Sequence, residues 1–309
     1  MRVVFMGTPD FAAGILEAVV LAGHEVVLAV SQPDKPKGRG KALQFPPVKE
    51  YAISQGIEVY QPRKVREAEC VEFIRERQPE IIVVAAFGQI LPKELLDLPK
   101  YGCINVHASL LPKYRGAAPI QWAVINGDKV SGVTIMRMDV GLDTGDIIET
   151  AETEISPEET GGSLFDKLEK LGAKLLVETM EKIENGTARY TKQEESQASH
   201  VGMIDKSMGD IDWKKSAVEI ENLIRGLNPW PSAYTRLNGK TLKIWKALPE
   251  PGGEPQKAGC VYLVNKKELK IHTGDGVLSL LEVQLEGKKR MDIPSFLRGY
   301  EVLSNAKLG

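Results

Sequence analysis

The clearest chemical signal in the sequence comes from two side chains that are two residues apart. Asn105 and His107 lie in the apolar, β-prone run Cys103-Ile104-Asn105-Val106-His107. Successive side chains of a strand point to opposite faces, so these two would share one face. An amide NH₂ can donate to a carbonyl oxygen that gains negative charge, and an imidazole can also move a proton near neutral pH. The pair is typical of acyl transfer to or from nitrogen, although a structural histidine would fit the same pattern.

Such a site also needs a carboxylate that fixes the imidazole ring. The turn Asp139-Val-Gly-Leu-Asp143-Thr-Gly-Asp146 follows a predicted strand and offers three carboxylates. Its spacing does not match the alternating ligands of an EF-hand loop. The chain has no Gly-x-Ser-x-Gly elbow, and neither Ser109 nor Cys103 has the setting of an activated nucleophile. We therefore expect direct transfer rather than a covalent intermediate.

The strands and helices predicted at the start of the chain follow a βαβ order. Apolar strands are predicted at 2–6 and 26–30, and they flank a helix at 11–22 with apolar residues at helical spacing. This alternation predicts an α/β fold, a Rossmann-like, open, parallel-rich sheet with helices on both faces. The first turn, at Gly7, lacks the later glycines of a dinucleotide-binding fingerprint, so NAD and FAD are disfavoured.

Beyond residue 207 the pattern changes to short strands. Five candidates are separated by turn-forming residues, at 233–237, 241–247, 259–264, 268–273 and 276–284. Strands of this length and number suggest a small antiparallel β-barrel, of which the OB-like barrel is one candidate. We therefore expect a catalytic domain at 1–189, a polar interdomain linker at 190–206 and a C-terminal barrel domain at 207–309.

Composition limits the class of protein. The 309 residues carry a net charge of −2 and only three cysteines, which are widely scattered and argue against a disulfide framework or a zinc site. No apolar run approaches the roughly 20 residues of a membrane helix, and the N-terminus lacks the apolar core of a signal peptide. We expect a cytoplasmic protein with no membrane contact and no metal.

One short stretch concentrates positive charge. Lys35-Pro-Lys37-Gly-Arg39-Gly-Lys41 lies in a long loop predicted at 32–47, at the edge of the sheet where open α/β proteins bind ligands. The part from residue 207 onward is also basic, with 16 Lys and Arg against 12 Asp and Glu. A basic patch on a protein of negative net charge suggests an anionic partner. The alternative is a solvated loop without a partner.

The residues around His107 carry a resemblance to a known family. The run from Asn105 to Pro119 and the turn from Asp139 to Asp146 resemble the two signature motifs of formyltransferases that use 10-formyltetrahydrofolate. The resemblance implies that Asn105 donates to the formyl oxygen, that His107 stabilises the tetrahedral oxyanion and moves a proton, and that Asp143 orients His107. It also implies a folate pocket lined largely by backbone at Ser109, Leu110, Leu111, Pro112, Phe87, Gly88, Gln89 and Ile90. Asp139 and Asp146 are expected to shape the turn rather than to take part in the reaction.

Within this superfamily the whole chain resembles the members that formylate the α-amino group of methionyl-tRNA. The basic stretch is similar to the loop that those enzymes insert into the acceptor arm of the tRNA, and Asn228-Pro-Trp230-Pro231 before a small barrel is similar to their C-terminal domain. The resemblance implies initiator methionyl-tRNA as the partner, and separately we expect a monomer. Phosphate contacts are expected from Lys35, Lys37, Arg39 and Lys41. Further candidates for such contacts are Lys240, Lys243, Lys246, Lys288 and Lys289.

Three other interpretations stay open at this point. A formyltransferase acting on an amino sugar nucleotide or another small amine would share the catalytic residues but should lack the basic loop. An RNA-binding protein with a relict catalytic half is opposed by the intact Asn105, His107 and Asp143. A hydrolase of formyl-folate would usually need a separate regulatory domain, for which the chain leaves no room.

Overall fold

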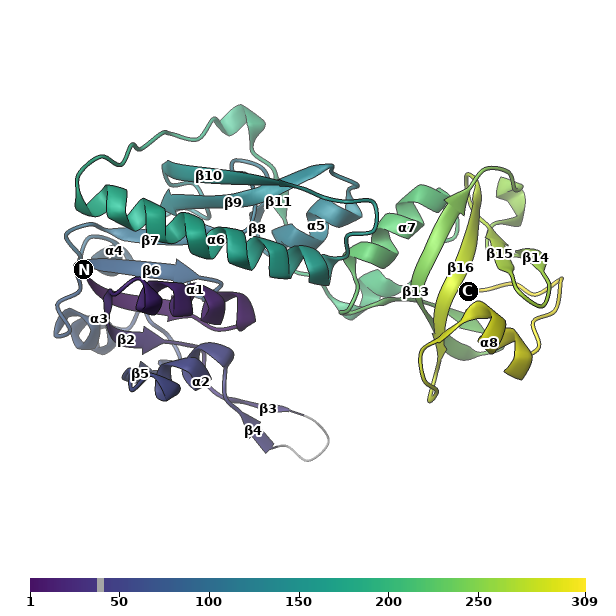
Figure 1. Cartoon of the computed structure of the whole chain (residues 1–309), viewed down its shortest axis with the longest axis horizontal. Coiled ribbons are helices and arrows are strands. Elements are labelled where there is room, and N and C mark those ends of the chain that lie inside the picture. The colour runs from purple at the N-terminus through teal and green to yellow at the C-terminus, as the bar shows by residue number, and fades with distance from the viewer. Residues whose placement is uncertain (38–41) are drawn as a thin grey trace. The chain divides into compact units, whose positions relative to one another are not determined.

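The computed structural model describes residues 1–37 and 42–309, with only the backbone described at 36, 37 and 42. The chain divides into two compact units (Figure 1). Unit 1 comprises residues 1–116, 130–153 and 165–201, and unit 2 comprises 117–129, 154–164 and 202–309. Two segments inside the predicted catalytic domain, 117–129 and 154–164, are thus grouped with the C-terminal part. The domain limits drawn from the sequence stay a prediction.

Unit 1 is built on a seven-stranded sheet with the order β10-β9-β7-β6-β1-β2-β5. Its strands are β1 (Arg2–Gly7), β2 (Glu25–Val30), β5 (Val59–Tyr60), β6 (Ile81–Ala85), β7 (Cys103–His107), β9 (Val130–Arg137) and β10 (Ile147–Glu154). The five strands from β7 to β5 pair in parallel, whereas β9 is antiparallel to β7. The predicted Rossmann-like, parallel-rich fold is confirmed. The central strands are almost wholly apolar because both faces of the sheet are covered.

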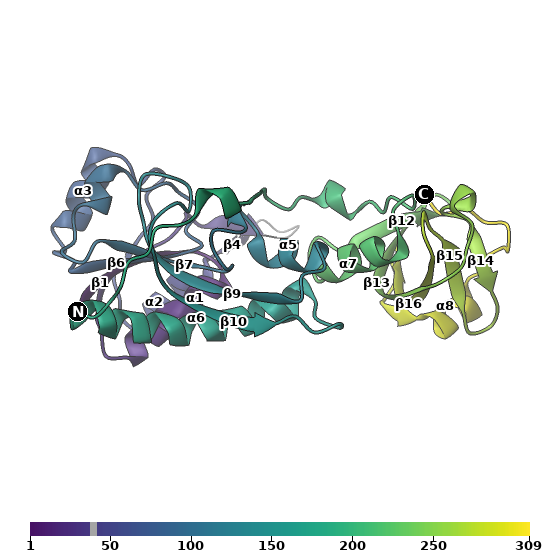
Figure 2. The ribbon, with the colours of Figure 1, turned by 90° about the horizontal axis from the view of Figure 1, so that it is seen from above.

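Helices cover both faces of this sheet (Figures 1 and 2). They are α1 (Asp10–Leu21), α2 (Pro47–Ser54), α3 (Ala68–Arg75), α4 (Lys93–Leu96) and α6 (Gly161–Glu184). In Figure 2, α1 and α6 lie on one side of the sheet and α3 on the other. A Cβ built on Gly172 of α6 would lie 3.1 Å from Val106, so Val106 faces α6. Asn105 and His107, its neighbours on β7, therefore face the opposite side.

The basic stretch, predicted as a loop, begins a short antiparallel hairpin of β3 (Lys35–Lys37) and β4 (Ala42–Gln44). A loop was predicted because Pro, Gly and Lys are poor strand formers. At the base of the hairpin, the Asp34 carboxylate accepts hydrogen bonds from Lys49 Nζ (2.7 Å) and Gln61 Nε2 (2.8 Å). These bonds, that from Lys49 first, hold the pKa of Asp34 below its usual value. The residue just before β3 is thus held in place by contacts with α2 and with Gln61.

Unit 2 contains a six-stranded antiparallel sheet with the order β12-β13-β16-β15-β14 and β17 beside β16. The strands are β12 (Ala233–Leu237), β13 (Lys240–Glu250), β14 (Val261–Val264), β15 (Leu269–His272), β16 (Val277–Leu285) and β17 (Met291–Asp292), and the helices are α5 (Pro119–Ile125), α7 (Ala217–Gly226) and α8 (Ile293–Gly299). All five predicted strands are present, so the expected C-terminal antiparallel β domain is confirmed. No helix in the described part of the chain is long and apolar enough to span a membrane.

The segment predicted as a polar linker has its own structure. A 3-10 turn occupies Glu195–Gln197, and β11 (His200–Val201) pairs in parallel with β8 (Arg115–Gly116). Ser199 supports the same junction, because its backbone oxygen accepts from Arg115 N at 2.8 Å. This pairing uses backbone and polar groups, which leave no apolar periodicity in the sequence. The segment therefore packs on the loop that follows His107.

Candidate functional site

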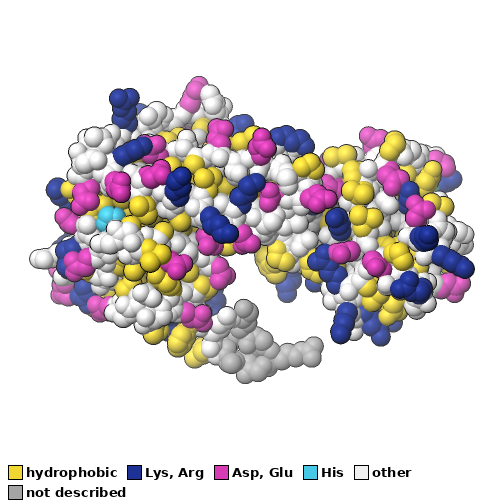
Figure 3. All heavy atoms as spheres, viewed as in Figure 1, with side chains coloured by type: hydrophobic (Ala, Val, Ile, Leu, Met, Phe, Trp, Pro, Cys, Tyr) yellow, Lys and Arg dark blue, Asp and Glu magenta, His cyan; other side chains and the backbone are white. Residues whose placement is uncertain are grey.

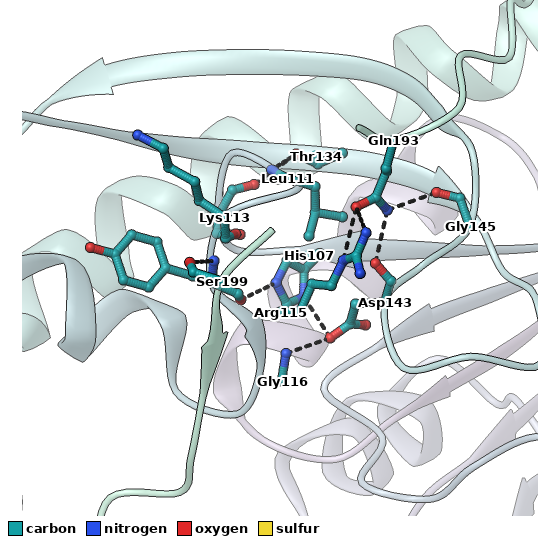
Figure 4. Close-up of polar contacts among 12 residues, drawn as sticks. His107, Leu111, Lys113, Arg115, Gly116, Thr134, Asp143, Gly145, Gln193 and Ser199 are labelled. Atoms are coloured by element: carbon teal, nitrogen blue, oxygen red, sulfur yellow. Dashed lines mark hydrogen bonds and ion pairs between the residues drawn. The ribbon is translucent and has the colours of Figure 1, made fainter. Parts of the chain in front are cut away.

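The structure brings His107 and Asp143 together within unit 1 (Figure 4). His107 Nδ1 lies 3.8 Å from Asp143 Oδ2, and the two side chains are only 7% and 12% exposed. On the other side of the ring, His107 Nε2 lies 2.9 Å from the backbone oxygen of Tyr114. Because a carbonyl only accepts, Nε2 must carry a hydrogen, and Nδ1 is the nitrogen left to take up or release a proton. The exchangeable site of the imidazole thus faces a carboxylate.

The route by which Asp143 reaches this position depends on the direction of β9. This strand is antiparallel to β7, and Arg137 at its end pairs with Ile104 near the start of β7. The loop at 138–146 therefore begins at the end of β7 that lies away from His107. It reaches the imidazole because it folds back along the strand.

Local hydrogen bonds give this loop its shape. Asp139 Oδ1 accepts from Gly141 N at 3.0 Å and from Thr144 Oγ1 at 2.6 Å, so Asp139 acts as the turn residue that its sequence pattern suggests. Asp143 itself has φ of 54°, a left-handed conformation that Asp tolerates better than most residues. Its Oδ2 accepts from Gly116 N at 2.8 Å. The carboxylate is therefore held by the segment that follows His107.

Asn105 lies on the same face of β7 as His107 and is half-buried. Among the residues that the structure describes, none forms a hydrogen bond with its side-chain amide. The amide can therefore donate to a ligand without first giving up a bond to one of these residues. The predicted pair on one strand face is present, and Asp143 joins it from a distant loop.

Sequence reasoning missed two residues behind this site, Arg115 and Gln193 (Figure 4). The Arg115 side chain is only 1% exposed. It donates from Nη1 to both oxygens of Glu195 (3.0 and 2.9 Å) and from Nε and Nη2 to Gln193 Oε1 (3.1 and 3.0 Å). Gln193 Nε2 in turn donates to the backbone oxygens of Asp143 and Gly145, both at 2.8 Å. No sequence signal pointed to Gln193, which lies in a polar stretch without periodicity.

The first group of predicted folate residues, 109–112, follows β7 directly. Ser109 is buried, and its Oγ donates to the backbone oxygen of Lys113 at 2.7 Å. The backbone N–H of Leu111 donates to Thr134 Oγ1 at 3.1 Å, and Thr134 Oγ1 donates to the backbone oxygen of Ser109 at 2.7 Å. These bonds fix the backbone of the segment. Contact of Ser109, Leu110, Leu111 and Pro112 with folate stays a prediction.

The second group, Phe87 to Ile90, follows β6, which is the parallel neighbour of β7. The two groups therefore leave the same edge of the sheet, where open α/β folds bind ligands. The Phe87 side chain is buried in the core, and its backbone oxygen accepts from Gln32 Nε2 at 3.1 Å. Gly88 has φ of 80° and is exposed, and the Ile90 side chain is 79% exposed. The folate contacts of Phe87, Gly88, Gln89 and Ile90 also stay predictions.

The predicted tRNA contacts are only partly described by the structure. Lys35 is exposed at the start of β3, Lys37 is described by its backbone in that strand, and Arg39 and Lys41 lie outside the described residues. Figure 3 shows further Lys and Arg side chains on the surface of unit 2. Of the lysines predicted as contacts in unit 2, Lys243 is half-buried. The exposed ones are Lys240, Lys246, Lys288 and Lys289. None of these contacts is tested by the structure.

Gly116 is the backbone donor to Asp143, and its replacement by alanine should disturb the site. Its φ is 101°, and an added Cβ would lie 2.5 Å from the backbone oxygen of Val201. We expect Gly116→Ala to lower the free energy of unfolding by about 2 kcal/mol or more and to lower kcat. Gly186→Ala is the matched control, because Gly186 has φ of 75° with no atom within 4 Å and should cost about 1 kcal/mol. Urea unfolding of both variants gives the comparison, and equal losses would show that the contact with Val201 is unimportant.

Among the described residues, no group of three or more His, Cys, Asp and Glu side chains could hold a metal ion. The arrangement offers an amide donor and an imidazole on one strand face, with a carboxylate beside the imidazole. Such a set can polarise a carbonyl, stabilise an oxyanion and move one proton.

Comparison with solved structures agrees with the fold. The structure of an N-formyltransferase from Helicobacter canadensis in complex with folinic acid and dTDP-3-aminofucose superposes with a TM-score of 0.67 at 21% identity. That alignment covers 94% of this chain and 100% of the other. Glycinamide ribonucleotide transformylase 1 from Symbiobacterium toebii superposes with a TM-score of 0.52 over 63% of this chain and 94% of its own, at 17% identity. At these identities the likeness concerns the fold alone.

Sequence comparison is more specific. Residues 1–180 match the Formyl transferase family, and residues 203–301 match the family described as Formyl transferase, C-terminal domain. The chain is 64% identical to the methionyl-tRNA formyltransferase of Agathobacter rectalis, over 98% of this chain and 97% of that protein. It is 55% identical to the methionyl-tRNA formyltransferase of Lachnospira eligens over the full length of both. The chain thus belongs to the formyl transferase family, in the group of the methionyl-tRNA formyltransferases.

Proposed function

We propose that this protein transfers the formyl group of 10-formyltetrahydrofolate to the α-amino group of initiator methionyl-tRNA. The observation that carries the proposal is the buried pair of His107 and Asp143 on the strand face that also carries the half-buried amide of Asn105. The chain that holds them is similar over its whole length to methionyl-tRNA formyltransferases. Family membership supports 10-formyltetrahydrofolate as the formyl donor. We further propose that the enzyme works as a monomer in the cytoplasm.

In the proposed reaction the three residues divide the work. The α-amino group reacts as the neutral amine, after its ammonium form has released one proton to solvent. The amine attacks the formyl carbon, and its nitrogen, which thereby becomes positively charged, gives a proton to His107 Nδ1. Asn105 donates to the resulting oxyanion, and the protonated imidazole also stabilises it. Asp143 balances the positive charge on the imidazole and orients the ring. When the bond between the formyl carbon and N10 breaks, N10 receives the proton, so one proton passes from the amine to the folate.

The surroundings of the site favour this direct route over a covalent formyl-enzyme. Cys103, on the same strand face, is 1% exposed, and burial raises the pKa of its thiol to about 12. A thiol that stays protonated is a poor nucleophile. The Ser109 hydroxyl is buried and donates to a backbone oxygen rather than to an imidazole. Neither side chain has the activated setting that a covalent route requires.

Positive side chains in the hairpin of β3 and β4 and in unit 2 support a tRNA as the acceptor of the formyl group. Lys35 is exposed on a hairpin whose base is fixed by Asp34, and three further positive residues follow it in the sequence. Unit 2 adds exposed lysines and Trp245, whose ring lies 5.5 Å from Lys243 Nζ and 5.1 Å from Arg290 Cζ. Positive side chains in these numbers suit the phosphates of an RNA better than a small amine.

The deciding experiment follows labelled formyl from 10-formyltetrahydrofolate to two acceptors side by side. We expect rapid transfer to charged initiator methionyl-tRNA and little to an amino sugar nucleotide. Uncharged tRNA is the control, because it has the same phosphates but lacks the methionyl amine. Ready transfer to the amino sugar nucleotide with none to methionyl-tRNA would overturn the proposal in favour of a small-amine formyltransferase.

A further inference from the structure

We propose that Gln193 is a positioning residue for the reaction: it holds the loop that carries Asp143 at the distance from His107 that transfer requires. The inference rests on the proposed function and extends it to a residue of the segment predicted as a polar linker. Gln193 lies 50 positions after Asp143 in the sequence, and the two meet only in the folded chain.

The hydrogen bonds of Gln193 leave no freedom in the orientation of its amide. Its Nε2 faces two backbone oxygens, of Asp143 and Gly145, which can only accept. Its Oε1 faces two nitrogens of Arg115, which can only donate. A neutral side chain that donates twice and accepts twice at one point must be an amide. The contact is therefore specific for a carboxamide rather than for polarity in general.

Arg115 restricts the position of this amide. Its guanidinium is almost completely buried, so moving it away from its partners would leave an unpaired buried charge. Its backbone is tied to the same segment, because Arg115 N donates to the backbone oxygen of Ser199 at 2.8 Å. Two residues before Gln193, Thr191 also exchanges two backbone hydrogen bonds of 2.8 Å with Ile147. The position of Gln193 is thus set by a buried ion and by backbone pairing on both sides.

Beyond the bonds that Asp139 accepts within the loop, the described residues offer few other contacts that fix the far end of the loop that Gln193 holds. It is closed at its base, where Arg137 N donates to the backbone oxygen of Asp146 at 2.8 Å. Its apolar side chains, Val140 and Leu142, are 72% and 58% exposed and anchor nothing in the core. The Asp143 carboxylate then depends on its bond to Gly116 N and on the two backbone bonds to Gln193. A displacement of about 1 Å in a catalytic group can cost about 100-fold in rate.

The test uses three variants of the full chain in the labelled transfer assay. Gln193→Ala removes both halves of the contact. Gln193→Glu keeps an acceptor for Arg115 and adds an ion pair, but its carboxylate cannot donate to the loop and repels the backbone oxygens. Gln197→Ala is the matched control, because Gln197 is in the same segment and its Nε2 donates to Glu194 at 2.7 Å rather than to the loop.

We expect kcat to fall about 10- to 100-fold in Gln193→Ala and at least as far in Gln193→Glu, with KM for both substrates within about twofold of wild type. Gln193→Glu should keep its melting temperature, because Arg115 stays paired. Gln197→Ala should match wild type. If Gln193→Glu retains wild-type kcat, or if kcat falls only in proportion to folded protein, Gln193 has a structural role and the inference is wrong. If the wild type itself transfers no formyl group, it is the proposed function that fails.

Discussion

Replacing His107 by alanine should lower kcat for formyl transfer about 1000-fold while leaving the affinity for methionyl-tRNA near normal. The imidazole is the group proposed to take the proton of the amine and return it to N10, and positioned acid-base catalysis contributes about 10²- to 10⁴-fold. Its side chain is 7% exposed inside unit 1, and its Nε2 bonds the backbone of Tyr114. It therefore has little surface to offer the tRNA. Single-turnover transfer and a separate tRNA-binding titration measure the two effects.

Asp143→Ala should resemble His107→Ala, and the double variant should be little worse than either single one. Residues that act as a unit show such non-additivity, because removing either one abolishes the whole function. His24→Ala is the control, since His24 contacts the N-terminal amine at 3.3 Å rather than the site. A parallel collapse of tRNA affinity in His107→Ala would refute the assigned role.

Removing the four positive charges of the basic stretch should raise KM for methionyl-tRNA about 10- to 100-fold. The variant carries Lys35→Ala, Lys37→Ala, Arg39→Ala and Lys41→Ala together. For each phosphate that the variant no longer neutralises, the plot of log kcat/KM against log salt concentration should become shallower by roughly 0.7 to 0.9. KM for 10-formyltetrahydrofolate should stay unchanged, because the folate residues are expected on other loops. Steady-state kinetics at several salt concentrations measure both quantities.

The control for this variant removes exposed lysines elsewhere in unit 1. Lys93 and Lys174 have side chains that are 72% and 77% exposed, and each lies beside a carboxylate four residues further along the chain. Lys93→Ala combined with Lys174→Ala should leave the salt dependence of the wild type. An equal effect in the control would reveal a general influence of net charge, and an unchanged KM in the variant of the basic stretch would return that stretch to a solvated loop.

Local patterns were sufficient to predict most elements of the fold. The strand at Cys103–His107, helix α1 and the five C-terminal strands follow from apolar periodicity, which reports burial directly. The hairpin of β3 and β4 was missed, because Pro, Gly and Lys show no strand preference before the two segments pair. The pairing of β11 with β8 was also missed, because it uses the backbone of a polar segment that has no apolar periodicity.

The chemistry that we propose was predicted from residue types, short spacings and the resemblance to the formyltransferase motifs, all of which can be read along the chain. Asn105 and His107 are two positions apart on a strand, so they lie on one face of it. The absence of a nucleophile elbow favours direct transfer. The position of the Asp143 carboxylate beside His107, by contrast, depends on the folding of distant segments onto one another. The antiparallel direction of β9 starts the loop of Asp143 at the far end of β7, so the loop must fold back and be held there. Gln193 and Arg115 hold it through polar contacts between distant parts of the chain, and such contacts leave no periodic trace in a sequence.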